Sequence, residues 1–138
     1  MFSRFNPAAR RVLRTAEQAS RNHNHYFIGV GHLMLALLDE NDGAIAARLQ
    51  ELGLSSSELG EATRRAVGTG EDRLWDGTLI TPRVRRVIVQ AEAACPPDAP
   101  VTPIALFDAL LAERAGLTAD VLAALRRRAT EGITAWNS

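Results

Sequence analysis

The sequence predicts an all-α fold: a tandem duplicated four-helix repeat, about eight helices in all, with pseudo-twofold symmetry between the copies. Residues 6–19 (NPAARRVLRTAEQA) align without gaps on residues 81–94 (TPRVRRVIVQAEAA). The match continues from residues 28–52 to residues 101–125 once two residues of the intervening loop are dropped. Apolar residues recur at helical spacing in both copies, and no strand of convincing length is present. Because a duplicated unit usually cannot bury its apolar face alone, we expect the two copies to pack on each other.

The identical pairs include prolines and arginines at the start of each copy. They also include alanines and leucines at helical spacing. They are Pro7/Pro82, Arg10/Arg85, Arg11/Arg86, Val12/Val87, Ala16/Ala91, Glu17/Glu92, Ala19/Ala94, Leu33/Leu106, Ala36/Ala109, Leu37/Leu110, Leu38/Leu111, Gly43/Gly116, Leu49/Leu122 and Leu52/Leu125.

A chain of 138 residues is long enough for one domain with a real core and too short for two independent ones. We therefore expect a single domain over residues 1–138. The first repeat should cover about 1–68, a linker about 69–80 and the second repeat about 81–138.

Four helices are expected in the first copy. Asn6 should cap a helix that starts at Pro7 and runs to about residue 21. A polar and aromatic connector leads to a helix over 32–40, which is apolar almost all round and should be the most buried element. A short helix ends at Gly53, and Ser55 or Ser56 caps the fourth helix, which Gly68 stops.

The second copy repeats this plan with more drift. Thr81 and Pro82 repeat the cap-and-proline start of a helix that runs to about residue 94. Thr102 with Pro103 opens the next helix, and Thr118 is expected to cap the one after it. A last weak helix is expected at about 128–136.

Composition narrows the class of protein. The 16 basic residues are balanced by 16 acidic ones, so bulk attraction to nucleic acid is not expected. The longest apolar run, Leu33 to Leu38, is far shorter than the roughly twenty residues that span a membrane, and no N-terminal apolar stretch resembles a secretory signal. We expect a cytoplasmic protein. The single Cys95 cannot form an internal disulfide and is expected to be an inert thiol.

The starts of the two copies carry motifs of a known family. They are Phe2, Phe5, the Arg10-Arg11 pair, Tyr26, Ile28-Gly29, His32 and the run Ile80-Thr81-Pro82-Arg83. These residues resemble the N-terminal domain of the Clp AAA+ unfoldases, most closely of the ClpC type, over essentially the whole chain. That domain is a double four-helix repeat that docks adaptor proteins and substrates for the ATPase ring. The resemblance therefore implies a non-catalytic binding module without a cofactor.

In some members of that family, one glutamate of each copy holds the guanidinium of a phosphorylated arginine. The matching positions are Gly31 and Ile104 here. Since neither side chain carries a charge to pair with a guanidinium cation, recognition of phosphoarginine in the familiar mode is expected to be lost.

The resemblance also implies a ligand groove between the first helices of the two copies, where some members bind cyclic peptide antibiotics. The matching positions are Phe2, Arg10, Leu13, Arg14, Glu17, Ile80, Arg85, Ile88 and Val89. The apolar members of this set would line a trough for an apolar peptide. The arginines at its edge would hold the carbonyl groups or a carboxylate of that peptide.

The expected partners are the Clp unfoldase system, its adaptors or its substrates, and cyclic peptide antibiotics. Two roles fit: an adaptor or regulator, or a decoy that sequesters ClpC-directed cyclic peptides. The chain has no G-x-x-x-x-G-K-[ST] phosphate loop, and the divergence of its second copy favours a free-standing relative over an excised domain.

Other function classes have weaker signals. His23, His25 and His32 suggest a metal site, but no carboxylate is close in sequence before Asp39, so we expect no metal and assign His32 to capping or packing its helix. The run 55–57 of serines lacks a nucleophile-elbow motif, which favours a helix cap over catalysis. The arginine clusters leave one alternative open, a small helical nucleic-acid-binding regulator.

Overall fold

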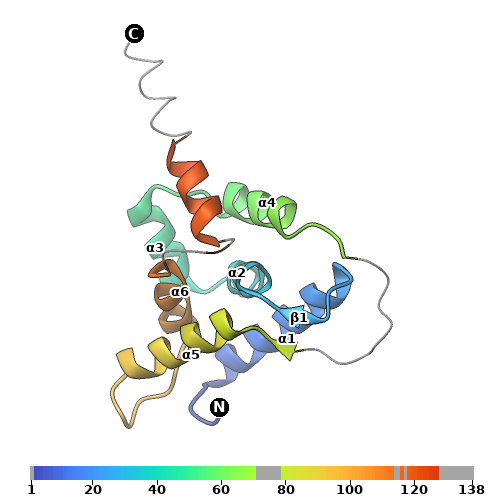
Figure 1. Cartoon of the computed structure of the whole chain (residues 1–138). Coiled ribbons are helices and arrows are strands. Elements are labelled where there is room, and N and C mark those ends of the chain that lie inside the picture. The colour runs from blue at the N-terminus through green and yellow to red at the C-terminus, as the bar shows by residue number, and fades with distance from the viewer. Residues whose placement is uncertain (1, 71–78, 114–115, 117, 128–138) are drawn as a thin grey trace.

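The computed structural model describes residues 2–70, 79–113, 116 and 118–127, and it is mostly helical (Figure 1). In chain order the elements are α1 Pro7–Asn22, β1 Phe27–Ile28, α2 Val30–Asp39, α3 Gly43–Leu52, α4 Ser56–Val67, β2 Leu79–Ile80, α5 Pro82–Ala94 and α6 Pro103–Leu111. Residues 118–127 form a further helix. The all-α fold class is therefore confirmed. The expected helix at 128–136 and most of the expected linker lie outside the described residues.

Three helices begin at the caps that the sequence predicts. The side chains of Asn6, Thr81 and Thr102 each accept a hydrogen bond from the backbone N–H three residues on, at 2.8, 3.3 and 3.4 Å. A proline follows each cap, where its fixed φ suits the first turn and its missing N–H costs nothing. Ser55, the first of the two serines considered, caps α4 by accepting from Glu58 N–H at 3.2 Å.

Helix α2 is the centre of the fold. It packs against α1, α4, α5 and α6, and it lies between α4 and α1 in Figure 1. It starts at Val30, two residues earlier than expected, because Gly29 serves as its N-cap. Most of its residues are buried, which confirms the expectation for this helix.

The helix over 118–127 starts differently from the prediction. Asp120 N–H donates to the carbonyl of Gly116 at 3.1 Å, so the first turn opens at Gly116. Thr118 is buried, and its hydroxyl has no hydrogen-bond partner in the described part of the chain. Thr118 is therefore a buried residue within this turn that forms no capping hydrogen bond with the described residues, and the prediction that it caps the helix is wrong.

Two short backbone pairings join the copies. Strand β1 pairs in parallel with β2, with Ile28 opposite Ile80, and Phe5 forms an isolated parallel bridge with Val101. These strands, each two residues long, are too short to leave an alternating pattern in the sequence. In the repeat alignment Phe5 is equivalent to Ile80 and Val101 to Ile28, so the two pairings occupy equivalent positions with the copies exchanged.

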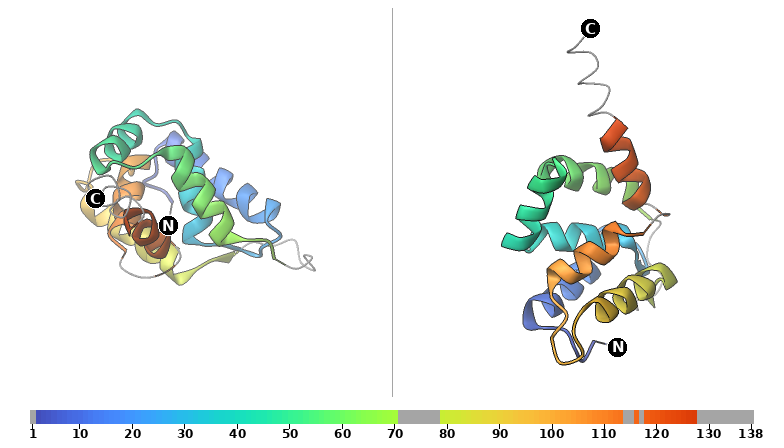
Figure 2. Two further views of the ribbon diagram at one scale, coloured as in Figure 1. Left: turned by 90° about the horizontal axis from the view of Figure 1, so that it is seen from above. Right: turned by 90° about the vertical axis from the view of Figure 1, so that its left-hand side faces the viewer.

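One hydrophobic core contains side chains from both copies. Equivalent residues are buried in each, such as Val12 with Val87 and Leu33 with Leu106. The right-hand view of Figure 2 shows α2 and α6 in the middle of the molecule, with α4 at one end and α1 and α5 at the other. The twofold relation between the copies remains a prediction. Among the helices described, none is long and apolar enough to cross a membrane.

Candidate functional site

A cavity of about 330 Å³ lies beside α1 and the β1–β2 pair. We call it the α1 groove. Its lining residues are Phe2, Arg10, Leu13, Arg14, Glu17, Ile28 and Ile80. The structure therefore brings together six of the nine residues of the predicted groove and adds Ile28.

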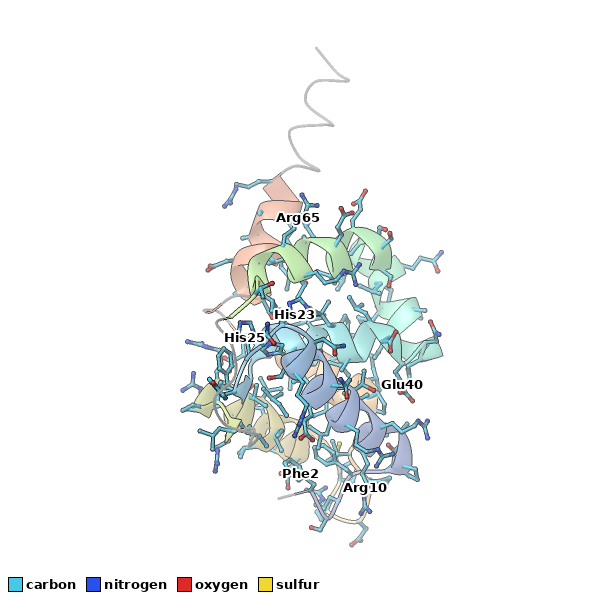
Figure 3. The ribbon with its side chains drawn as sticks, turned by 90° about the vertical axis from the view of Figure 1, so that its right-hand side faces the viewer. Phe2, Arg10, His23, His25, Glu40 and Arg65 are labelled. Atoms are coloured by element: carbon cyan, nitrogen blue, oxygen red, sulfur yellow. The ribbon has the colours of Figure 1, made fainter. Side chains whose placement is uncertain are left out.

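The spacing of the α1 residues explains why they share this groove. Residues 10, 13, 14 and 17 follow the i, i+3, i+4, i+7 pattern of one helix face. The ring of Phe2 meets the buried ring of Phe5 edge to face, with centroids 5.4 Å apart. This contact holds Phe2 at the N-terminal end of α1, where Figure 3 shows it close to Arg10.

The floor of the groove is apolar and its rim is charged. Ile28 and Ile80 face each other across the strand pair, and Leu13 packs against the core beside them. Arg10 Nε donates to the carbonyl of Phe5 at 3.2 Å. Glu17, the one carboxylate at the rim, accepts a hydrogen bond from Arg21 on the next turn at 3.1 Å. The charge of Arg21 therefore offsets the negative charge of Glu17.

Three residues of the predicted set do not line the cavity. Ile88 is fully buried in the stripe that α5 packs into the core. Val89 is 59% exposed, and Arg85 is exposed on the outer face of α5. Successive helix residues lie about 100° apart, so a helix whose buried stripe includes Ile88 turns Val89 outward. Ile28 is not among the residues predicted for the groove, since only the pairing of two distant strands places it there.

A second cavity, of about 440 Å³, lies at the start of α2 and α5. We call it the histidine pocket. Its lining residues are His25, Phe27, Gly29, Val30, Gly31, His32, Val67, Thr81, Pro82, Arg83 and Arg86. Figure 3 shows His25 and its neighbour His23 at the opposite end of α1 from Phe2 and Arg10, so the two cavities are separate.

Two of the three histidines, His25 and His32, are hydrogen-bonded to each other, and His23 bonds to the backbone. The backbone N–H of Gly29 donates to His32 Nδ1 at 3.0 Å, so the ring proton of neutral His32 is on Nε2, which lies 2.9 Å from His25 Nδ1. His23 Nδ1 lies 2.7 Å from the carbonyl oxygen of Gly68. His32 therefore caps the first turn of α2, which confirms its predicted role.

Burial lowers the pKa of two of these rings, His32 and His25. Desolvation lowers the pKa of His32 to about 4, and the nearby His25 and His23 rings add to the effect. Burial also lowers the pKa of His25, with a further contribution from His23. Both His32 nitrogens are hydrogen-bonded, and within the described residues no group of three or more His, Cys, Asp or Glu side chains is arranged to hold a metal ion.

The two positions that replace the family glutamates lie at the starts of equivalent helices. Gly31 is buried in the first turn of α2 and lines the histidine pocket. Ile104 is partly buried in the first turn of α6 and packs against the core. Neither position presents a carboxylate.

Solved structures share this fold. The N-terminal domain of Hsp104 from Candida albicans superposes with a TM-score of 0.71 at 12% identity, over 85% of this chain and 78% of that one. The N-terminal domain of the chaperone ClpD from Arabidopsis thaliana gives 0.61 at 18% identity, over 91% and 97%. The fold is thus that of the N-terminal domains of these chaperones.

The sequence identifies the family. The model of the Clp repeat (R) N-terminal domain matches residues 4–122, and the chain belongs to this family. It is 34% identical over 88 residues to the negative regulator of genetic competence ClpC/MecB of Bacillus subtilis strain 168. It is 35% identical over 89 residues to the ATP-dependent Clp protease ATP-binding subunit ClpC of Staphylococcus aureus strain USA300. Each match covers 64% of this chain but only 11% of the relative.

Proposed function

We propose that this domain is a non-catalytic module that binds peptides or proteins in the α1 groove, without a cofactor. The observation that carries this proposal is the composition of the groove. Phe2, Leu13 and Ile80 supply an apolar floor, while Arg10 and Arg14 supply donors at its rim. This combination suits an extended apolar peptide, whose side chains would be buried and whose carbonyl groups would accept from the arginines.

Membership of the Clp repeat family supports a role beside the Clp unfoldase system, with its adaptors or substrates as partners. Two roles fit this proposal. As an adaptor or regulator, the domain would hold a client or a component of the unfoldase system. As a decoy, it would sequester a cyclic peptide antibiotic directed at ClpC.

A titration of a ClpC-directed cyclic peptide into the protein tests the groove and the decoy role together. Burying one aromatic anchor typically contributes on the order of 2 kcal/mol or more, so Phe2→Ala should weaken binding at least about tenfold. Val89→Ala is the matched control, since it removes an apolar side chain that lies outside the groove.

The outcomes separate the two roles. Tenfold weaker binding by Phe2→Ala with unchanged binding by Val89→Ala supports the groove. Equal losses in both variants would show that the groove is not the site. No binding by the unaltered protein would exclude the decoy role and leave the adaptor role.

Nucleic-acid binding is the alternative. Two of its candidate cations, Arg11 and Arg86, face the carboxylates of Glu40 and Glu113, which reduces the positive field of their helices. Binding to DNA that weakens steeply with salt would support this alternative, and we expect no such binding.

A further inference from the structure

The histidine pocket lies on the opposite side of the β1–β2 pair from the α1 groove. Ile28 and Ile80 line the groove, whereas their chain neighbours Phe27 and Thr81 line the pocket. Neighbouring residues of a strand point to opposite faces, so the two cavities cannot be parts of one site. The pocket is therefore a separate candidate site.

One wall of the pocket is apolar and continues onto the surface. Phe27, Val30, Val67 and Pro82 line it. Phe27 is 41% exposed, and its partner across the strand pair, Leu79, is 61% exposed. Two large, exposed apolar side chains thus lie side by side, one of them in the wall of the cavity, and such a surface is typical of one that a partner covers.

The charged side chains that line the pocket in the described part of the chain are arginines. Arg83 and Arg86 line it, and none of its described lining residues is acidic. Glu113 offsets part of the charge of Arg86, but its Oε1 lies 3.8 Å from Arg86 Nε and the Arg86 side chain is 56% exposed, so this guanidinium remains within reach of a ligand.

The ends of two helices add to this field. Gly29, the cap of α2, has no side chain to accept from the first turn. The first turns of α2 and α5 both line the cavity. The positive ends of both helix dipoles therefore reinforce the two arginines.

We propose that the histidine pocket binds the C-terminal end of a peptide whose last residues are apolar. The terminal carboxylate would pair with Arg86 of α5, beside the starts of α2 and α5. The last side chain would enter the cavity between Val67 and Pro82, and the preceding residue would cover Phe27. The last residue of such a peptide carries a carboxylate next to an apolar side chain. It is therefore complementary to a pocket in which an apolar wall lies beside a cation. The proposal is independent of the α1 groove.

Fluorescence anisotropy with matched peptides tests it. The probe is a fluorescein-labelled hexapeptide that ends in two leucines with a free carboxylate. We expect it to bind about tenfold or more tightly than its C-terminal amide, because the amide cannot form charge-assisted hydrogen bonds with the arginines. It should also bind more tightly than a free-acid hexapeptide that ends in two serines.

Three variants locate the site. Arg86→Gln should weaken binding of the free-acid peptide several-fold, whereas Arg85→Gln, on the same helix but outside the pocket, should leave it unchanged. Gly31→Glu adds a carboxylate to the pocket and should abolish the preference for the free acid. An acidic residue in the first turn of α2 is favourable to the helix, but Gly31 is buried, so urea unfolding of this variant must show that it keeps the fold before its binding is compared.

Three results would overturn the proposal: equal affinity for acid and amide, equal losses from Arg86→Gln and Arg85→Gln, or no binding of the free-acid peptide at millimolar protein. Phe2→Ala should not change binding of this probe. A failure of the α1 groove is therefore distinguishable from a failure of the histidine pocket.

Discussion

Arg11 Nη2 lies 2.8 Å from Glu40 Oε1 and joins the outer face of α1 to the C-terminal end of α2. In the second copy, Arg86 Nε lies 3.8 Å from Glu113 Oε1. Both residues of the second pair are equivalent to those of the first in the repeat alignment. The side-chain exposures also match, at 54% and 14% against 56% and 13%. Like the exchanged backbone pairings, the two ion pairs support a common ancestry of the copies.

The repeat predicts a specific superposition. Residues 6–52 laid on residues 81–125 should give helices in the same order, related by a rotation near 180°, because equivalent caps, core residues and ion pairs recur. A crystal structure of the protein provides the measurement. Copies that differ in helix order, or a rotation far from twofold, would contradict this expectation.

Phosphoarginine should not be recognised. Since Gly31 and Ile104 carry no charge, neither copy offers a carboxylate that could hold the guanidinium at the family position. Calorimetric titration should show free phosphoarginine binding no better than arginine or phosphate. Micromolar binding specific to phosphoarginine would show that the family site has been misplaced.

Arg4 should be important for stability although it lies near the chain end. Its guanidinium donates to the carbonyl groups of Glu92, Pro96 and Ala99 at 3.2, 2.9 and 3.2 Å, which ties the N-terminus to the end of α5. Hydrogen bonds from a charged donor contribute about 1.5 to 3 kcal/mol, so Arg4→Ala should lower the free energy of unfolding by about 2 kcal/mol. Urea unfolding provides the measurement.

Arg85→Ala is the control for Arg4, as it removes an exposed arginine from α5. A change within about 0.5 kcal/mol is expected for it. If both variants lower the free energy of unfolding equally, the hydrogen bonds of Arg4 do not account for the loss.

Neighbouring residues of α5 should behave in opposite ways. Ile88 is fully buried and Val89 is 59% exposed. Truncation of a buried isoleucine costs about 2 to 5 kcal/mol, so Ile88→Ala should be strongly destabilising while Val89→Ala should change little. Thermal unfolding of the two variants distinguishes them. A stable Ile88→Ala variant would mean that this side chain is not part of the core.

His32 should make stability depend on pH. Its pKa falls from an ordinary 6.5 to about 4 in the fold, so the unfolded chain binds a proton between these values and the folded chain does not. The free energy of unfolding should therefore keep its full value above about pH 6.5. It should decrease as the pH falls towards 4, by up to roughly 3 kcal/mol.

Urea unfolding at pH 7 and pH 4.5 measures this effect, and His32→Asn provides the comparison. Asparagine keeps an oxygen that can accept from Gly29 N–H but does not titrate, so the dependence on pH should become shallower. An unchanged dependence in this variant would assign the effect to other groups.

Local patterns were sufficient for most of the helices. The caps Asn6, Thr81 and Thr102 are side chains whose hydrogen bonds close within three residues, so their chemistry is visible in the sequence. The i, i+3, i+4, i+7 spacing of α1 likewise predicted which of its residues share one face. Such interactions depend on neighbours in the chain and not on the rest of the fold.

The duplication determined more than any single motif, because aligned copies predict the same elements twice. The repeat alignment did not reveal where divergence between the copies had changed the structural role of a residue. Thr118 has the residue type of a cap but lies buried inside the first turn. Its neighbour Gly116 opens that turn instead.

The sequence by itself determined the all-α class, the family, the starts of the helices with a side-chain cap at Asn6, Ser55, Thr81 or Thr102, and the α1 face of the groove. Only the tertiary structure placed Ile28 in that groove, buried Ile88 in the core, and gathered the starts of α2 and α5 around the histidine pocket. The physical reason is distance along the chain. Strand pairs such as Phe27 with Leu79 bring together residues that no local pattern relates. The rotation of α5 about its axis, as it packs on the core, decides which of its side chains remain accessible.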